Sequence, residues 1–150
     1  MNSYRQSLHH IVFCTKSRKN TLPEVHHEEL YKYIFGVIKN RKTVLYRING
    51  IENHIHIFCD LHSSIGVGDF VKEIKTATNK WIKASGQFPK FDSWAEGYCS
   101  ISYNLKDKDM IINYIKSQKE HHKKVTFEDE LRTLLIENGI EFDEKYLFDD

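Results

Sequence analysis

The stretch from position 53 to 62, Asn-His-Ile-His-Ile-Phe-Cys-Asp-Leu-His, has a two-residue period. The odd positions from Ile55 to Leu61 are all apolar, whereas the even positions begin with His54 and His56. Successive side chains of a strand point to opposite faces, so the pattern predicts a strand with one buried face and the two histidines together on the other. Their Cβ atoms would lie roughly 7 Å apart, close enough for both rings to turn onto one ion. Such a site needs a third ligand and a reacting group from elsewhere in the chain.

The order of the elements along the chain predicts the fold class. Apolar and β-branched runs predict strands at 8–15, 43–51, 54–61 and 94–103, and helical spacing predicts helices at about 23–42, 69–85, 107–122 and 126–137. Asp107 is the expected N-cap of the third helix, and Thr126 begins an approximate capping box. The order βαββαβ with two appended helices is typical of an α+β, ferredoxin-like sandwich. In that architecture, helices cover one face of an antiparallel sheet and the other face is available for ligands.

Composition limits the class of protein. A length of 150 residues with 40% hydrophobic content indicates one compact domain over 1–150 with a real core. No apolar run is long enough to span a membrane, and the first residues lack the apolar core of a signal peptide, so we expect a cytoplasmic protein. Cys14, Cys59 and Cys99 are odd in number and widely spaced, which indicates reduced, buried thiols.

The net charge of +1 is unevenly distributed. Residues 125–150 hold nine acidic and two basic residues, and residues 1–124 hold 20 basic and 12 acidic ones. A basic body suits a polyanionic partner, and an acidic segment could shield that surface or dock on it. A solvated surface of mixed charge is equally compatible with these numbers, so charge alone favours nucleic acid only modestly.

The predicted third helix carries side chains that could serve as a nucleophile and as a metal ligand. Tyr114 and Gln118 are four residues apart and share one helix face, and His121 falls on the same side. A tyrosine that attacks phosphorus benefits from a neighbouring ion that neutralises the phosphate. The amide oxygen of Gln118 suits a hard cation such as Mg²⁺ or Mn²⁺, and two imidazoles make a transition ion acceptable. If this helix packs across the histidine face of the strand, one site gathers two histidines, one glutamine and one tyrosine.

With these residues in place, the chain resembles the single-tyrosine HUH transposases of small insertion sequences, including their repeat-associated relatives. The resemblance covers nearly the whole chain. It is carried by the segment 12–18, by His54-Ile55-His56 as the histidine–hydrophobic–histidine motif, by Tyr114-Ile115-Lys116-Ser117-Gln118, and by the stretches 120–122 and 126–131. The tripeptide alone is a weak signal, but the Tyr-x-x-x-Gln spacing about sixty residues later makes the combination specific.

The resemblance implies a detailed activity. His54, His56 and Gln118 would hold Mg²⁺ or Mn²⁺, and Tyr114 would attack a phosphate of single-stranded DNA to form a 5′-phosphotyrosine link. The freed 3′-hydroxyl can attack another such link and so join strands, for excision and insertion of an insertion sequence. The family acts on hairpin ends of its own element as a homodimer, in which the tyrosine helix of one subunit can complete the site of the other.

Each of these residues also has a simpler interpretation. The histidine pair could be polar residues on the solvent-exposed face of a sheet, Tyr114 could be a core residue, and Gln118 could be an ordinary helix former.

Contacts to DNA are predicted from the densest basic positions and from the histidines after the tyrosine: Lys16, Arg18, Lys19, Arg41, Lys42, His121 and His122.

Three classes of function therefore stay open. The first is the transposase. The second is a non-catalytic module that binds single-stranded nucleic acid on a ferredoxin-like sheet. The third is a metal-dependent phosphodiesterase that uses activated water and would survive the change Tyr114→Phe. Tyr114 separates the three classes.

Overall fold

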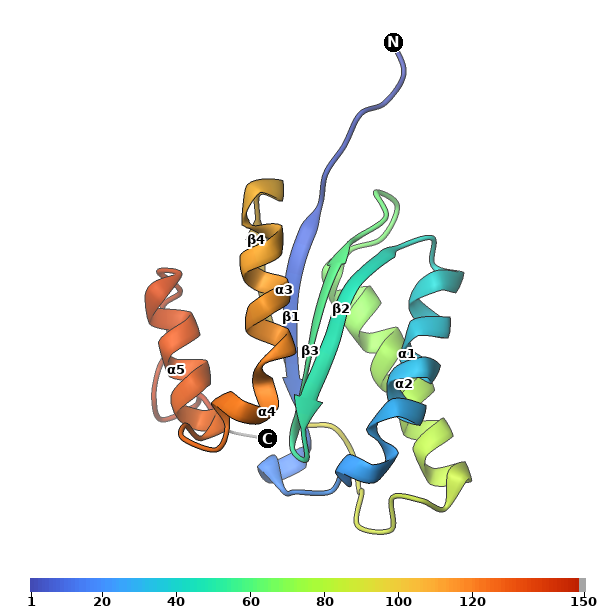
Figure 1. Cartoon of the computed structure of the whole chain (residues 1–150), viewed down its shortest axis with the longest axis vertical. Helices are drawn as coiled ribbons and strands as arrows, with labels where there is room; N and C mark the ends of the chain where they lie inside the picture. The colour runs from blue at the N-terminus through green and yellow to red at the C-terminus, as the bar shows by residue number, and fades with distance from the viewer. Residues whose placement is uncertain (149–150) are drawn as a thin grey trace.

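Four strands form one antiparallel sheet in the computed structural model, which describes residues 1–148 (Figure 1). They are β1 (Leu8–Cys14), β2 (Val44–Ile51), β3 (His54–Asp60) and β4 (Cys99–Tyr103), in the spatial order β2-β3-β1-β4. Each neighbouring pair is antiparallel. The two halves of the βαββαβ unit thus interleave, which confirms the predicted ferredoxin-like α+β fold.

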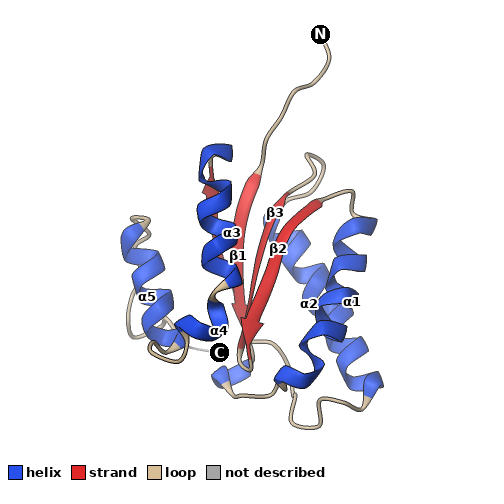
Figure 2. Cartoon of the chain, viewed as in Figure 1, coloured by secondary structure: helices blue, strands red, loops and turns tan. Residues whose placement is uncertain are grey.

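Helices cover both faces of this sheet (Figure 2). The helices α1 (His27–Asn40) and α2 (Val67–Ser85) lie on one face, and α3 (Lys108–Lys116), α4 (Gln118–His121) and α5 (Phe127–Glu137) lie on the other. Short 3₁₀ helices occupy Lys16–Arg18 (η1), Glu24–His26 (η2) and Leu105–Asp107 (η3). The sheet face that we expected to be available for ligands is therefore covered by the C-terminal helices.

The side chains of β3 point alternately to the two faces of the sheet, and both faces are packed against helices. Ile55, Ile57 and Cys59 belong to the main apolar cluster together with side chains of α1 and α2. On the opposite face, His54, His56 and Phe58 are also fully buried, and Phe58 packs against Ile111 and Ile115 of α3. The histidine side of the strand is thus a second interior rather than a wet surface.

The predicted third helix is divided. It consists of α3 and α4, with Ser117 between them at φ −92° and ψ 12°. The side-chain amide of Asn49, on β2, donates to the carbonyl oxygens of Ile115 and Lys116 at 3.1 and 3.2 Å, so it satisfies acceptors that the end of α3 leaves free. These bonds fix the end of the tyrosine helix against the sheet.

Two further expectations need correction. Asp107 is the N-cap residue of α3, as predicted, but its side chain makes no capping hydrogen bond; Asn104 caps the preceding η3 by accepting from the Lys106 amide. The fourth strand begins only at Cys99, although Trp94 makes an isolated bridge to Thr15. The Thr126 cap is confirmed, since its hydroxyl accepts from the Asp129 amide at 3.2 Å.

The hairpin between β2 and β3 is tight where the site begins. A Cβ atom at Gly50 would overlap the carbonyl oxygen of His54, so only glycine fits there. Cys59 and Cys99 are buried thiols, and Cys14 is half-buried. No helix within residues 1–148 is long and apolar enough to cross a membrane.

Candidate metal and nucleophile site

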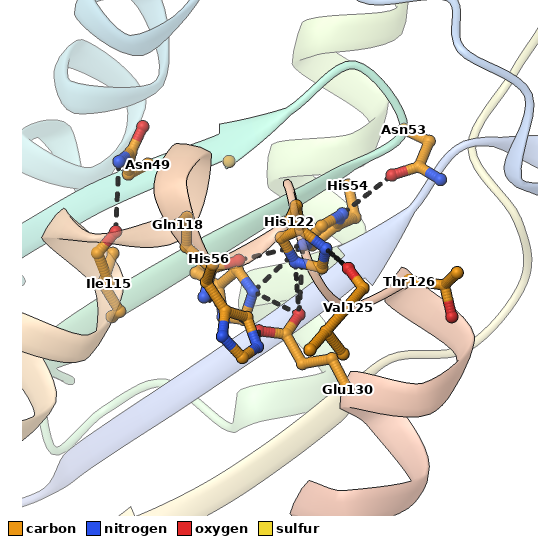
Figure 3. Close-up of polar contacts among 12 residues, drawn as sticks. Asn49, Asn53, His54, His56, Ile115, Gln118, His122, Val125, Thr126 and Glu130 are labelled. Carbon is orange, nitrogen blue, oxygen red and sulfur yellow. Dashed lines mark hydrogen bonds and ion pairs between the residues drawn. The ribbon is translucent and has the colours of Figure 1, made fainter.

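Three imidazoles converge on one carboxylate oxygen beneath the C-terminal helices (Figure 3). The Nε2 atoms of His54, His56 and His122 lie 3.2, 3.1 and 3.0 Å from Oε1 of Glu130. The rings of His54 and His56 come from β3, His122 follows α4, and Glu130 projects from α5. One ligand atom from each of these four residues lies within 4.8 Å of the others. This buried group could hold a metal ion.

The residues predicted on the tyrosine helix reach the same group. Gln118 is fully buried, and its Oε1 lies 3.2 Å from Nε2 of His54. Its Nε2 donates to Oε2 of Glu130 at 2.8 Å. The hydroxyl of Tyr114 donates to that same oxygen in a short hydrogen bond. The structure therefore brings together all four residues that the sequence proposed for the site, although Tyr114 and Gln118 stand on different helices.

The outward nitrogens of the imidazoles have their own partners. Nδ1 of His54 lies 2.8 Å from Oδ1 of Asn53, and Nδ1 of His122 lies 2.8 Å from the carbonyl oxygen of Val125. Nδ1 of His56 lies 2.7 Å from Nε2 of His10, which is buried on β1 and stacks on the His56 ring. Partners of this kind fix the ring orientation and leave Nε2 facing the site.

Burial and hydrogen bonding set the charges. Burial alone would raise the pKa of the Glu130 carboxyl, but the hydrogen bonds with His122, His54 and His56 outweigh burial and hold this pKa well below its usual range. Burial lowers the pKa of His54 to about 4 and that of His10 to about 3. Burial and the adjacent Glu130 carboxylate raise the pKa of the Tyr114 hydroxyl. At neutral pH the centre thus holds an anionic Glu130 carboxylate, neutral His54 and His10 rings and a protonated Tyr114 phenol.

The chemistry of these donors fits a divalent ion. Imidazole nitrogens with a carboxylate and an amide oxygen form a mixed set that binds Mn²⁺ and other transition ions well. An ionised carboxylate that is almost completely buried also requires compensation by positive charge or by several hydrogen bonds. Both considerations agree with the expectation of a divalent metal at His54 and His56.

The predicted DNA contacts divide into two groups. Lys16, Arg18 and Lys19 follow β1, and the pairing of Cys14 with His54 places them at the site's end of the sheet. Arg18 makes an ion pair with Glu128 at 3.6 Å and donates to the carbonyl oxygen of Phe148, so the acidic segment does contact this basic loop.

Arg41 and Lys42 lie at the opposite end, just before β2 starts beside Asp60. Arg41 forms an ion pair with Glu73. His121 has a half-buried side chain 3.5 Å from Oε2 of Glu130, whereas the ring of His122 is 3% exposed and belongs to the cluster instead of the outer surface. The residues proposed to contact phosphate thus lie at two opposite ends of the sheet, and His122 lies inside the buried cluster.

Sequence reasoning missed Glu130 and His10, and it placed His122 differently. Glu130 had a detectable signal, because it falls between Phe127 and Leu134 at helical spacing and so interrupts the apolar stripe of α5. His10 sits on the same strand face as Leu8, at period two. Neither signal shows by itself that these side chains meet His56.

The family of the chain follows from a comparison of its sequence with known protein families. The sequence profile of the family described as Transposase IS200 like matches residues 3–118, which is more than half of the chain. The chain belongs to this family of DNA transposases. The match ends at Gln118, so His122 and Glu130 lie beyond the matched segment. No curated protein sequence matches the chain.

Solved structures agree with the fold. A protein from Deinococcus radiodurans R1, provisionally described as a transposase, superposes with a TM-score of 0.61 at 19% identity, over 79% of this chain and 95% of that one. A REP-associated tyrosine transposase bound to a REP hairpin superposes with a TM-score of 0.62 at 20% identity, over 83% of this chain and 76% of that one. At these identities, the comparison establishes the fold alone.

Proposed function

We propose that this transposase cleaves single-stranded DNA and transfers strands through a 5′-phosphotyrosine intermediate on Tyr114, with the help of a divalent ion. One observation carries the proposal. The Tyr114 hydroxyl is bonded to the carboxylate whose other oxygen contacts Nε2 of His54 and His56. A candidate nucleophile and a candidate ion site thus share one residue, Glu130.

His54, His56 and Gln118 would hold the ion, which we propose to be Mg²⁺ or Mn²⁺. Bound there, the ion would polarise the scissile phosphate and offset its negative charge. The histidines supply the lone pairs of their Nε2 atoms, and Gln118 supplies an amide oxygen 3.2 Å from Nε2 of His54. Complete burial of these three side chains keeps the ligands fixed and limits competition from water.

Tyr114 would perform the covalent step. Its phenol oxygen bonds to phosphorus, and the bond from phosphorus to the 3′-oxygen of the preceding nucleotide breaks, so the departing strand ends in a 3′-hydroxyl. The proton of the phenol has an acceptor within hydrogen-bond reach in Oε2 of Glu130. The ester on the tyrosine conserves the energy of the cleaved bond, so a 3′-hydroxyl can later reverse the step and join a different strand.

The substrate would be single-stranded DNA that includes the hairpin ends of the protein's own element. The REP-associated structural neighbour is bound to a hairpin, and the two chains share the fold. Lys16, Arg18 and Lys19 lie at the site's end of the sheet and would contact the phosphates there. Arg41 and Lys42, at the far end, would contact a more distant part of the strand.

We also propose a homodimer with composite sites. In the described chain, the Tyr114 hydroxyl contacts Glu130 of its own subunit, so one subunit can assemble both halves of a site. Exchange of the tyrosine helices between subunits would place the same groups across an interface. A mixture of Tyr114→Phe and His56→Ala subunits tests the exchange, because cleavage recovers in the mixture only if the tyrosine acts on the partner's site.

A covalent-adduct assay tests the main proposal. Single-stranded oligonucleotides tiled across the DNA that flanks the gene are incubated with protein and Mn²⁺ or Mg²⁺ and resolved on a denaturing gel. We expect a protein–DNA band that requires the ion and disappears in Tyr114→Phe. Tyr33→Phe is a matched control, since Tyr33 stacks on Trp81 in the helix layer of the opposite face.

Two outcomes would contradict the proposal. Cleavage that survives Tyr114→Phe would favour a phosphodiesterase that uses activated water. Retention of DNA without cleavage in any oligonucleotide would favour a module that only binds single-stranded nucleic acid.

A further inference from the structure

The hydrogen bonds around His54 fix which of its nitrogens carries a proton. The amide of Asn53 is oriented by its own Nδ2, which donates to the carbonyl oxygen of Arg18 at 3.3 Å, so Oδ1 faces the His54 ring. Nδ1 of His54 must therefore carry the hydrogen that Oδ1 accepts. In the neutral ring, Nε2 then holds a lone pair, and this lone pair faces Oε1 of both Gln118 and Glu130.

The same argument holds independently for His122. Its Nδ1 lies 2.8 Å from the backbone carbonyl oxygen of Val125, which can only accept, so Nδ1 carries the hydrogen. When the ring is neutral, Nε2 of His122 therefore presents its lone pair to the site, 3.0 Å from Oε1 of Glu130. Acceptor nitrogens that face one carboxylate oxygen require a positive charge among them, which either a proton, as in the hydrogen bonds described above, or a metal ion supplies.

The spacing of these atoms fits a shared ion. Transition ions bind imidazole nitrogen and carboxylate oxygen at about 2.0–2.2 Å, which separates neighbouring ligands by roughly 3.0–3.5 Å in octahedral or tetrahedral geometry. The observed separations are 3.1 Å between the Nε2 atoms of His54 and His56, and 3.0–3.2 Å from each imidazole to Oε1 of Glu130. These four separations match the distances between neighbouring ligands of one ion.

We infer that His122 and Glu130 complete the coordination of the ion begun by His54 and His56, so that the ion fastens α5 and the turn after α4 to the sheet. Both residues lie beyond the segment that the family profile matches. The inference deepens the proposed function and depends on it for the role of the ion in cleavage. Glu130 supplies Oε1 to the ion while its Oε2 accepts from Gln118 and Tyr114.

The donor set also determines the class of ion. Three imidazoles and one carboxylate suit Mn²⁺, Fe²⁺, Co²⁺ or Zn²⁺, whereas Mg²⁺ prefers oxygen ligands and retains several waters. A site with only His54, His56 and Gln118 would discriminate less, because it lacks one nitrogen ligand and the negative charge. We therefore expect the protein to bind Mn²⁺ at least about tenfold more tightly than Mg²⁺.

The test is a calorimetric titration of the full chain, stripped of metal by a chelator, with Mn²⁺ and with Mg²⁺. The variants are Glu130→Gln and His122→Ala, and each should weaken Mn²⁺ binding by more than about tenfold. Glu120→Gln is the matched control, because it removes the same charge from an exposed side chain of α4 and should bind as the unchanged protein does.

A second measurement guards against a folding defect in either variant. The visible absorption of bound Co²⁺ reports the number and type of its ligands, so His122→Ala should change the band positions even where binding persists. Unchanged Mn²⁺ affinity and an unchanged Co²⁺ spectrum in both variants would overturn the inference. Weakened binding in both, together with a changed spectrum, would support it.

The adduct assay separates the two proposals. If DNA adducts form with Mn²⁺ while Glu130→Gln and His122→Ala bind the ion normally, the inference fails and the proposed function stands. If the ion binds through Glu130 and His122 but no adduct forms, the site is real and the proposed function fails.

Discussion

Ile55 and His56 are neighbours on β3, and neither side chain is exposed to solvent, yet they are buried against different partners. Ile55 packs into the apolar cluster under α1 and α2. His56 contacts Glu130 and His10 under the C-terminal helices. Apolar burial tolerates small shifts at a modest cost, whereas a buried polar group must meet its partners at defined distances. One strand thus separates an apolar layer under α1 and α2 from a polar layer that contains the candidate site.

The largest expected effect falls on the polar layer. His56→Ala should lower the rate of adduct formation at least about 10³-fold, because loss of an ion ligand removes several kcal/mol of charge stabilisation. The rate is measured on the oligonucleotide that the unchanged protein cleaves best. His62→Ala, six residues further along the chain and outside the cluster, is the control; a reduction below tenfold for His56→Ala would remove His56 from the site.

The next change affects the apolar layer one residue away. Ile57→Ala should lower the free energy of unfolding by about 3 kcal/mol, since it creates a cavity in a fully buried cluster. Urea denaturation followed by circular dichroism measures the loss. Val44→Ala, whose side chain on β2 is 53% exposed, should change stability by less than about 0.5 kcal/mol. Ion affinity should survive in Ile57→Ala, and its collapse would show that the two layers are not separate.

His10 provides a smaller and more specific test of the polar layer. His10→Phe keeps the ring volume but removes the partner of Nδ1 of His56, so Mn²⁺ affinity should fall by about 10–100-fold. His10→Gln retains a polar partner and should restore part of the affinity. His9→Gln, on the opposite face of β1, is the control. Equal affinities for His10→Phe and the unchanged protein would reduce His10 to a packing residue.

The last test concerns the pH dependence of stability in the metal-free protein. The folded-state pKa values of His54 and His10, about 4 and about 3, lie below the ordinary value of 6.5, so the unfolded chain binds protons that the folded chain does not. Stability should therefore fall as pH decreases from about 6.5 towards 4, by at most about 1.4 kcal/mol per pH unit for each group. Urea denaturation in chelator across this range measures the slope, and His10→Phe should flatten it.

The two layers also differ in how far the sequence predicts them. The period of two in β3 and the helical spacing of Leu30, Ile34 and Ile38 predict the sheet and its first helical layer, because both patterns follow from local geometry. The Tyr-x-x-x-Gln spacing identifies the tyrosine helix. In the structure, Ser117 breaks that helix, a tertiary effect that no local pattern indicates.

The remaining part of the site depends on contacts across long stretches of chain. Glu130 meets His56 across 74 residues, and His10 meets His56 across 46. An acidic residue within an apolar helix stripe signals that a partner exists, but it does not identify that partner. Only the docking of α5 on the sheet shows that the carboxylate serves the histidines.

The position of Glu130 after all four strands has a consequence for biosynthesis. Translation proceeds from the N-terminus, so all four strands and Tyr114 leave the ribosome before the carboxylate does. A nascent chain can therefore hold its sheet together while the candidate ion site still lacks its anionic member. The proposed cleavage site therefore becomes complete only after the whole sheet has been synthesised.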